Sequence, residues 1–199
     1  MKNTISNITT LLITLLLVTS CGSIKNMNPG DKKFEPPCTG KAYMSSKKAF
    51  REPGQGESID YATSRKKALS NARSALAETV NSTIKKVEDN FVNSLEENNQ
   101  EQIREKFQGN TRTVVDTQIQ GSIVICEEAH KNKETGRYTT YIVMELSNNT
   151  LARDIMNSFK EDEKNSSQNL DDESQMRIEF DYERFQDTFN KALEDFKGE

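Results

Sequence analysis

The chain has 199 residues, of which 33% are hydrophobic and 29% are charged, with 27 basic residues against 31 acidic ones. This length suits one domain with a moderate core rather than two domains. Because no block of Lys and Arg with interleaved aromatic residues occurs, the composition gives no support to a role in binding nucleic acid.

The N-terminus has the pattern of a bacterial export signal. Lys2 is the only charge before the apolar run at 11–18, and this run is shorter than the roughly 20 apolar residues that a membrane-spanning helix needs. The sequence predicts cleavage between Ser20 and Cys21, so residues 1–20 are expected to be a signal peptide. The alternative is an ordinary signal peptide in which Cys21 is incidental.

The tetrapeptide Val18-Thr19-Ser20-Cys21 resembles the lipobox of bacterial lipoproteins. In that pattern the cysteine thiol receives a diacylglyceryl group, and its freed amine is acylated, for example with palmitate. Several acyl chains hold a protein on a membrane, since each buried methylene contributes about 0.8 kcal/mol. Gly22 follows, not an aspartate, which resembles lipoproteins passed on to the outer membrane. We therefore expect a lipid anchor at Cys21 and a location on the periplasmic face of the outer membrane, with surface exposure left open.

Two cysteines remain once Cys21 carries lipid, and export places them in an oxidising compartment. A disulfide between Cys38 and Cys126 would close an interval of 88 residues (126 minus 38) and contribute on the order of 4 kcal/mol in the entropic account. The alternative is two separate buried thiols, because the sequence does not give the distance between the two Cα atoms. The only histidine, His130, is expected on the surface where a strand enters a hairpin turn.

Residues 21–40 are expected to form a lipidated, flexible tether, because they contain Pro-Gly and Pro-Pro pairs and few large apolar residues. A compact α/β domain is expected over residues 41–151. Its first element is a strand over Lys41–Arg51, whose apolar residues alternate loosely. A glycine-containing loop at 53–56 is expected to end that strand.

A long helix is the clearest element of the sequence. Ser58 or Asp60 supplies an N-cap, and apolar residues recur at three- and four-residue steps until about Phe91. The inward face is rich in alanine in its first half, which allows a close approach to a sheet. A weaker helix is expected from Gln100, with an interruption at Gly109-Asn110.

Two alternating runs, Ile119 to Ala129 and Tyr138 to Leu146, predict an antiparallel hairpin with its turn at Lys131 to Gly136. Apolar residues occur on both faces of these runs, so the sheet can be covered on both sides. Together with the long helix, the hairpin predicts an α+β fold, in which a small antiparallel sheet packs with an alanine-rich helix.

Residues 152–199 are expected to be a helical C-terminal extension with an acidic, polar break at 161–173. Beyond the break, four aromatic residues keep helical spacing along one stripe and need a surface to bury against. These residues are Tyr182, Phe185, Phe189 and Phe196. The stripe either packs on the chain's own domain, which we favour, or forms a face that binds an envelope protein or a second copy of this chain.

The order of these features resembles one family of bacterial lipoproteins. The lipobox and the proline-containing tether are followed by Gly40-Lys41-Ala42-Tyr43, by an alanine-rich helix through Ala68 and Ala72, and by a hairpin ending at Leu146. This order is similar to the family of the twenty-kilodalton antigenic lipoprotein of Helicobacter, whose domain resembles the N-terminal domain of flagellar assembly protein T. The resemblance covers about residues 41–151 and implies a helix laid on a small sheet, with no enzymatic activity. The strand at Ala42 lacks the G-x-G-like stretch that the resemblance implies.

Motifs for chemistry are not found in the sequence. It contains no G-x-S-x-G, no H-E-x-x-H, no Walker-type glycine loop and no cysteine pair at metal spacing. We therefore expect no catalytic residue, no metal site, no cofactor and no small-molecule substrate. The expected function is that of a non-enzymatic binding or structural module of the envelope. The alternative is an accessory or activator subunit of an envelope machine for peptidoglycan synthesis or flagellum-like assembly, which the long tether favours.

Overall fold

The computed structural model describes residues 35–95, 100–168 and 181–198, without the side chains of 166–168. The predicted signal peptide, its cleavage site at Ser20 and the predicted lipid attachment site at Cys21 lie outside these residues. The chain divides into Met1–Glu35 and a folded unit, Pro36–Glu199. The folded unit therefore begins within the predicted tether of residues 21–40.

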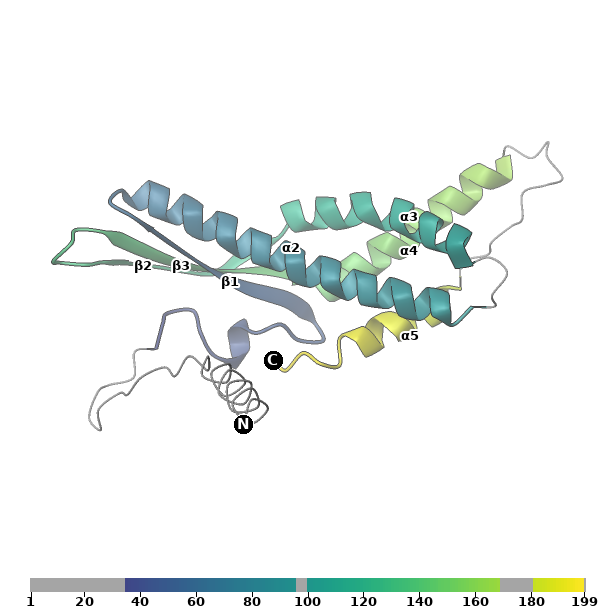
Figure 1. Ribbon diagram of the computed structural model, residues 1–199, viewed down its shortest axis with the longest axis horizontal. Helices are drawn as coiled ribbons and strands as arrows, with labels where there is room; N and C mark the ends of the chain where they lie inside the picture. The colour runs from purple at the N-terminus through teal and green to yellow at the C-terminus, as the bar shows by residue number, and fades with distance from the viewer. Residues whose placement is uncertain (1–34, 96–99, 169–180, 199) are drawn as a thin grey trace, which may run out of the picture. The chain divides into compact units, whose positions relative to one another are not determined.

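Within its described residues the folded unit has a three-stranded antiparallel sheet and four α-helices (Figure 1). The predicted α+β fold, with a long helix on a small sheet and a C-terminal amphipathic helix, is confirmed. The sheet has the strand order β1-β3-β2. In chain order the elements are the 3-10 turn η1 (Lys41–Tyr43), β1 (Ala49–Ser58), α2 (Tyr61–Asn93), α3 (Gln100–Gln120), β2 (Ile123–Lys131), β3 (Tyr138–Ser147), α4 (Asn148–Gln168) and α5 (Tyr182–Ala192).

Strand β1 runs through the segment that was predicted to be a glycine-containing loop, so that prediction is wrong. The predicted strand at Lys41–Arg51 coincides with β1 only over its last three residues (49 to 51). A Cβ atom added to Gly54 would overlap the backbone nitrogen of Ala72 and lie 2.7 Å from its Cα, and one added to Gly56 would overlap the α2 backbone as well. The glycines are needed because helix α2 rests directly on the strand and leaves no room for a side chain.

Helix α2 supplies the matching surface for these glycines. Asp60 is its N-cap, with a side chain that accepts a hydrogen bond from the backbone nitrogen of Thr63, as one of the two predicted starts requires. Ser64, Ala68 and Ala72 are fully buried toward the sheet. Because these small side chains recur every four residues, they form one stripe along which the helix backbone approaches β1 closely.

Helix α3 is continuous where an interruption was predicted at Gly109-Asn110. Its buried residues recur at four-residue steps and are Phe107, Thr111, Val115 and Ile119. This stripe packs between α2 and α4, and its burial outweighs the roughly 1 kcal/mol that a glycine costs inside a helix. Ile119 therefore ends the helix stripe and is not part of the following strand, which starts at Ile123.

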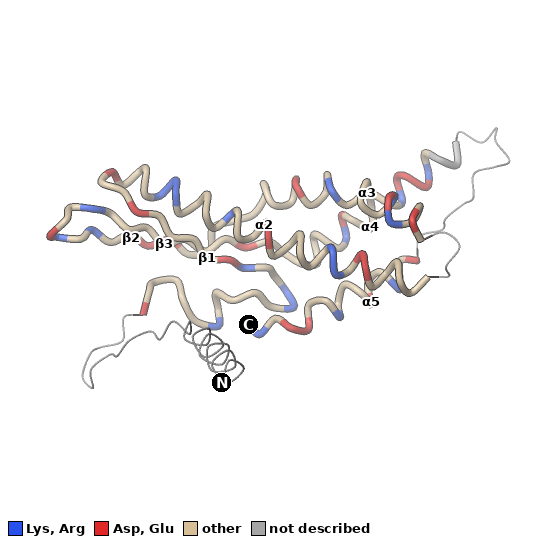
Figure 2. The backbone as a smooth tube through the Cα atoms, in the orientation of Figure 1, with Lys and Arg blue, Asp and Glu red and all other residues tan. Residues whose placement is uncertain are grey.

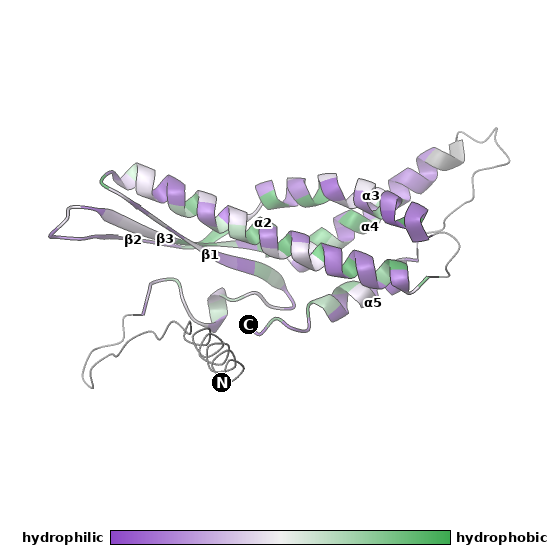
Figure 3. Cartoon of the chain, viewed as in Figure 1, coloured by the Kyte–Doolittle hydropathy of each residue, from purple (hydrophilic) through white to green (hydrophobic). Residues whose placement is uncertain are grey.

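The predicted hairpin is present as β2 and β3, with its turn between Lys131 and Tyr138. Central strand β3 buries Ile142 in the core that includes α2, and Val143 is also fully buried. Strand β2 lies at the sheet edge, has a register shift between Val124 and Cys126, and is exposed along most of its length. Figure 3 shows the hairpin end as hydrophilic, which suits an edge strand that has to avoid pairing with other chains.

The C-terminal helices belong to the same folded unit as the sheet, and are not an extension beyond residue 151. Helix α4 crosses that predicted boundary and continues to Gln168, through the first eight residues of the predicted polar break (161 to 168). Residues 169–173 of the break lie outside the described part of the chain. The helices join because each contributes phenylalanine to one cluster, whose ring centroids are 5.7 to 6.4 Å apart. The cluster consists of Phe91, Phe107, Phe159, Phe185 and Phe189.

Candidate functional site

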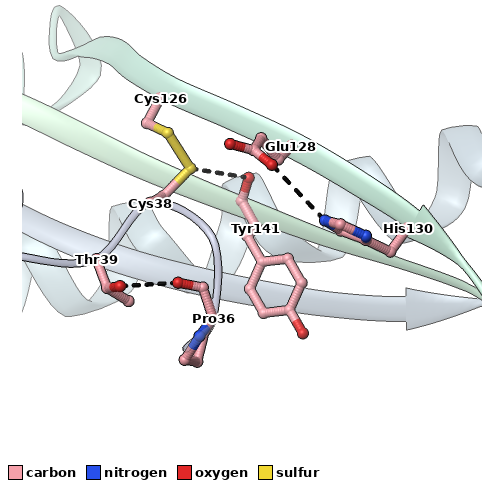
Figure 4. Close-up of a disulfide and its surroundings, with 7 residues drawn as sticks. All are labelled: Pro36, Cys38, Thr39, Cys126, Glu128, His130 and Tyr141. Atoms are coloured by element: carbon pink, nitrogen blue, oxygen red, sulfur yellow. Dashed lines mark hydrogen bonds and ion pairs between the residues drawn. A yellow bond between two sulfur atoms is a disulfide. The ribbon is translucent and has the colours of Figure 1, made fainter. Parts of the chain in front are cut away.

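Cys38 and Cys126 form a disulfide in the structure, so the bridged alternative is the one observed (Figure 4). Their sulfur atoms are 2.07 Å apart and their Cα atoms 5.8 Å apart. Cys38 has a φ of 58° and sits in a tight turn in which the Thr39 hydroxyl donates to the carbonyl oxygen of Pro36 at 2.8 Å. The turn presents Cys38 to the face of the sheet, where its Sγ lies 4.0 Å from the carbonyl oxygen of Tyr141. The disulfide thus fastens the start of the folded unit to edge strand β2.

Two titratable side chains lie beside the disulfide on β2. Sulfur atoms of Cys38 and Cys126 and a carboxylate oxygen of Glu128 all lie within 4.8 Å of one another. Nε2 of His130 is 3.6 Å from the Glu128 carboxylate, and its ring stands edge-on to Tyr141 with centroids 6.1 Å apart. The histidine is exposed, as the sequence predicts, but it is not isolated.

Breaking the disulfide is expected to lower stability by about 4 kcal/mol, because the bridge closes an interval of 88 residues in the unfolded chain. Reduction should therefore lower the melting temperature by roughly 10 °C. Thermal unfolding with and without reductant measures this difference. In a Cys38→Ser/Cys126→Ser variant, reductant should change nothing. Quantitative labelling of both thiols in unreduced, denatured protein would contradict the bridge.

The aromatic stripe of the last helix is packed inside the molecule. Phe185 and Phe189 are buried, and Phe196, just beyond α5, stands edge-on to Phe50 with centroids 5.6 Å apart. The Tyr182 hydroxyl donates to Glu163 at 3.0 Å. The stripe therefore packs on the chain's own domain, and these four residues do not form an exposed face for a partner.

A groove of about 680 Å³ lies between α2 and α3. Its most buried charge is Glu88, which accepts hydrogen bonds from Arg104 at 3.0 Å and Gln108 at 2.8 Å. Arg104 also donates to Asp89 at 2.6 Å. These polar groups provide hydrogen-bond partners for one another across the two helices. Their arrangement accounts for the pairing of α2 with α3 and does not itself indicate a ligand.

Two glutamates near the sheet have pKa values shifted in opposite directions. Partial burial raises the pKa of Glu52, against a hydrogen bond from Thr79, and the nearby charge of Glu78 raises it further. Hydrogen bonds from Arg65, at 2.7 and 2.9 Å, hold the pKa of Glu127 below its ordinary value. A raised pKa means that the charged form is disfavoured in the folded state, and a lowered pKa means the reverse.

These shifts predict opposite effects of two conservative substitutions. At pH 7, Glu52→Gln should raise the melting temperature and Glu127→Gln should lower it, each by the equivalent of up to about 1 kcal/mol. Stability from Glu127 is present above its unfolded pKa and is lost as pH falls through its folded pKa. The penalty from charged Glu52 disappears as pH falls through its own raised pKa. Thermal unfolding from pH 7 to pH 3 should therefore show both differences shrinking toward zero, and a same-sign pair at pH 7 would contradict the assignment.

The distribution of charge and of apolar residues describes the surface of the folded unit. Basic and acidic residues are interspersed along the helices and strands and do not separate by sign (Figure 2). Within residues 35–95, 100–168 and 181–198, no helix has the length and apolar character needed to cross a membrane.

Comparison with family models, curated proteins and solved structures found no match for this chain.

The grouping at the disulfide was only partly predictable. The pair Cys38 and Cys126 was recognised because these two cysteines remain after Cys21. Cys126 and Glu128 lie two residues apart on the predicted strand, and His130 lies two residues further on, just beyond its expected end. This spacing contained a further signal, since alternate strand residues share a face. That pattern could have placed all three side chains together before the structure was known.

Proposed function

We propose that the chain is a non-enzymatic, lipid-anchored lipoprotein of the bacterial envelope, held by Cys21 on the periplasmic side of the outer membrane. In this proposal it acts as a binding or structural module and needs no cofactor. The observation that carries the proposal is the sequence up to Cys21, with one basic residue, a short apolar run and a lipobox-like Val18-Thr19-Ser20-Cys21.

The disulfide between Cys38 and Cys126 supports this proposal. Such bridges persist in oxidising compartments, and they are rare in the reducing cytosol.

The experiment for the anchor is substitution of Cys21 by serine. The unchanged protein should be found with membranes and should incorporate labelled fatty acid. Cys21→Ser should give an uncleaved or soluble form without lipid, because no other group at the junction forms a thioether. A Ser23→Ala variant, changed two residues downstream, is the matched control and should behave like the unchanged protein. Fatty-acid incorporation that persists in Cys21→Ser would contradict the proposal.

The length of the tether favours a second candidate, an accessory subunit of an envelope machine. With the folded unit beginning at Pro36, 14 residues (22 to 35) separate it from the proposed anchor. At about 3.5 Å per residue they reach at most about 50 Å. Crosslinking in intact cells followed by purification tests this candidate: one recurrent envelope protein at near-stoichiometric yield supports it, and recovery of the chain alone contradicts it.

A further inference from the structure

The two cysteines beyond Cys21 and the one histidine of this chain lie at one place in the fold. Beyond Cys21 the sequence has two cysteines and one histidine. All three lie in the group around the disulfide, together with Glu128 (Figure 4). Cys126, Glu128 and His130 occupy alternate positions of β2, and Cys38 reaches the same face from the turn that begins the folded unit.

We propose that, when the disulfide is reduced, Cys38, Cys126 and Glu128 bind one divalent cation of the zinc type. Two thiolates and a carboxylate are a ligand set that Zn²⁺ accepts, with water in the fourth tetrahedral position. Zinc bonds of about 2.3 Å would place the two sulfurs about 3.8 Å apart. The observed Cα separation of 5.8 Å leaves room for this, and the Glu128 carboxylate already lies within 4.8 Å of both sulfurs.

His130 is a positioning residue in this site. Its Nε2 is 3.6 Å from the Glu128 carboxylate, and its ring rests edge-on against Tyr141. A group that holds a ligating carboxylate in place typically changes metal affinity by 10- to 100-fold when it is removed.

Metal binding and disulfide formation exclude each other, because both use the same two sulfurs. Oxidation of the two thiolates to a disulfide passes two electrons to a disulfide oxidant, which takes up two protons to become a dithiol, and the cation is released. Either state ties the turn at residues 36–40 to β2, so the end of the proposed tether stays fastened to the sheet. The metal site does not depend on the lipid anchor.

The test uses the full chain carrying Cys21→Ser, so that Cys38 and Cys126 are its only cysteines. A phosphine reduces the disulfide to two thiols and becomes phosphine oxide, with water supplying the oxygen and the two thiol protons, and the excess phosphine is removed under nitrogen. Titration with Co²⁺ should give one ion per chain with a sulfur-to-cobalt charge-transfer band, and Zn²⁺ should abolish that band because it binds such sites more tightly. Circular dichroism before and after titration records whether the reduced chain is folded. Absence of the band in the reduced chain, folded or unfolded, overturns the proposal.

Single-residue variants test which side chains bind the metal and which only position a ligand. The unreduced chain and the Cys38→Ser variant should give no band. Glu128→Gln should weaken Co²⁺ binding by 10-fold or more, and His130→Ala by about 10-fold. Glu134→Gln, in the exposed hairpin turn, is the matched control and should bind as the parent does. Parent affinity in Glu128→Gln would overturn the ligand set, and parent affinity in His130→Ala would overturn the positioning role.

Discussion

Replacing Gly54 by alanine is expected to cost about 3 kcal/mol of stability or more, because the added methyl group has no room between β1 and α2. The added Cβ would overlap backbone atoms of Ala68 and Ala72, which are not the flexible end of a side chain. Relief therefore requires that α2 move away from β1, and that movement would open the core beneath the helix. Chemical denaturation measures the loss as a lower midpoint at unchanged slope.

Gly109→Ala is the matched control for this prediction. Gly109 lies within α3 at a solvent-exposed position, and a Cβ added there would meet no atom within 4 Å. The same chemical change should stabilise the protein by about 0.5 to 1 kcal/mol, since alanine is the better helix former. Equal effects at Gly54 and Gly109 would contradict the close packing of α2 on the strand.

Phe185→Ala is expected to cost about 3 to 5 kcal/mol, because it removes a fully buried ring from the centre of the phenylalanine cluster. The ring of Phe185 contacts those of Phe91, Phe107 and Phe189, with centroids 6.0 to 6.4 Å apart. The cavity left behind would loosen α5 from three other helices. The measurement is again the free energy of unfolding, with limited proteolysis to detect a released C-terminus.

Asp187→Ala tests the same helix on its exposed side and should change stability by no more than about 0.5 kcal/mol. An unchanged melting temperature in Phe185→Ala would mean that α5 is not packed on its own domain in solution. The helix would then be available to a partner or a membrane surface.

Local signals predicted the fold where the pattern of residues agrees with the tertiary packing. The long helix had both a cap at Asp60 and a continuous stripe, and the hairpin had two alternating runs with a short turn between them. Prediction failed at Gly54, Gly56 and Gly109. Glycine ordinarily indicates a turn, but the first two are required by close contact with α2, and the third is held in a helix by its buried neighbours.

In the candidate site, too, some features were predictable from the sequence and others depend on tertiary packing. Cys38 and Cys126 were identified as a possible pair because they are the two cysteines left after Cys21. The distance between them depends on how the turn around Cys38 lies against the sheet, and no local sequence pattern specifies this. His130 was expected on the surface and Glu128 was not singled out as a site residue, because Cys38, their neighbour in space, is about 90 residues away in the sequence. The aromatic stripe was recognised from its spacing, but the residues that bury it come from β1, α2, α3 and α4, which are far from it in the sequence.

The most direct test of the proposed function is the mass of the N-terminal peptide from protein purified out of native envelopes. The proposal predicts a peptide that begins at Cys21, with a diacylglyceryl thioether on its sulfur and an acyl chain on its amine. A peptide that retains residues 1–20, or one in which Cys21 has an unmodified thiol, would contradict the lipid anchor and the envelope function that is built on it.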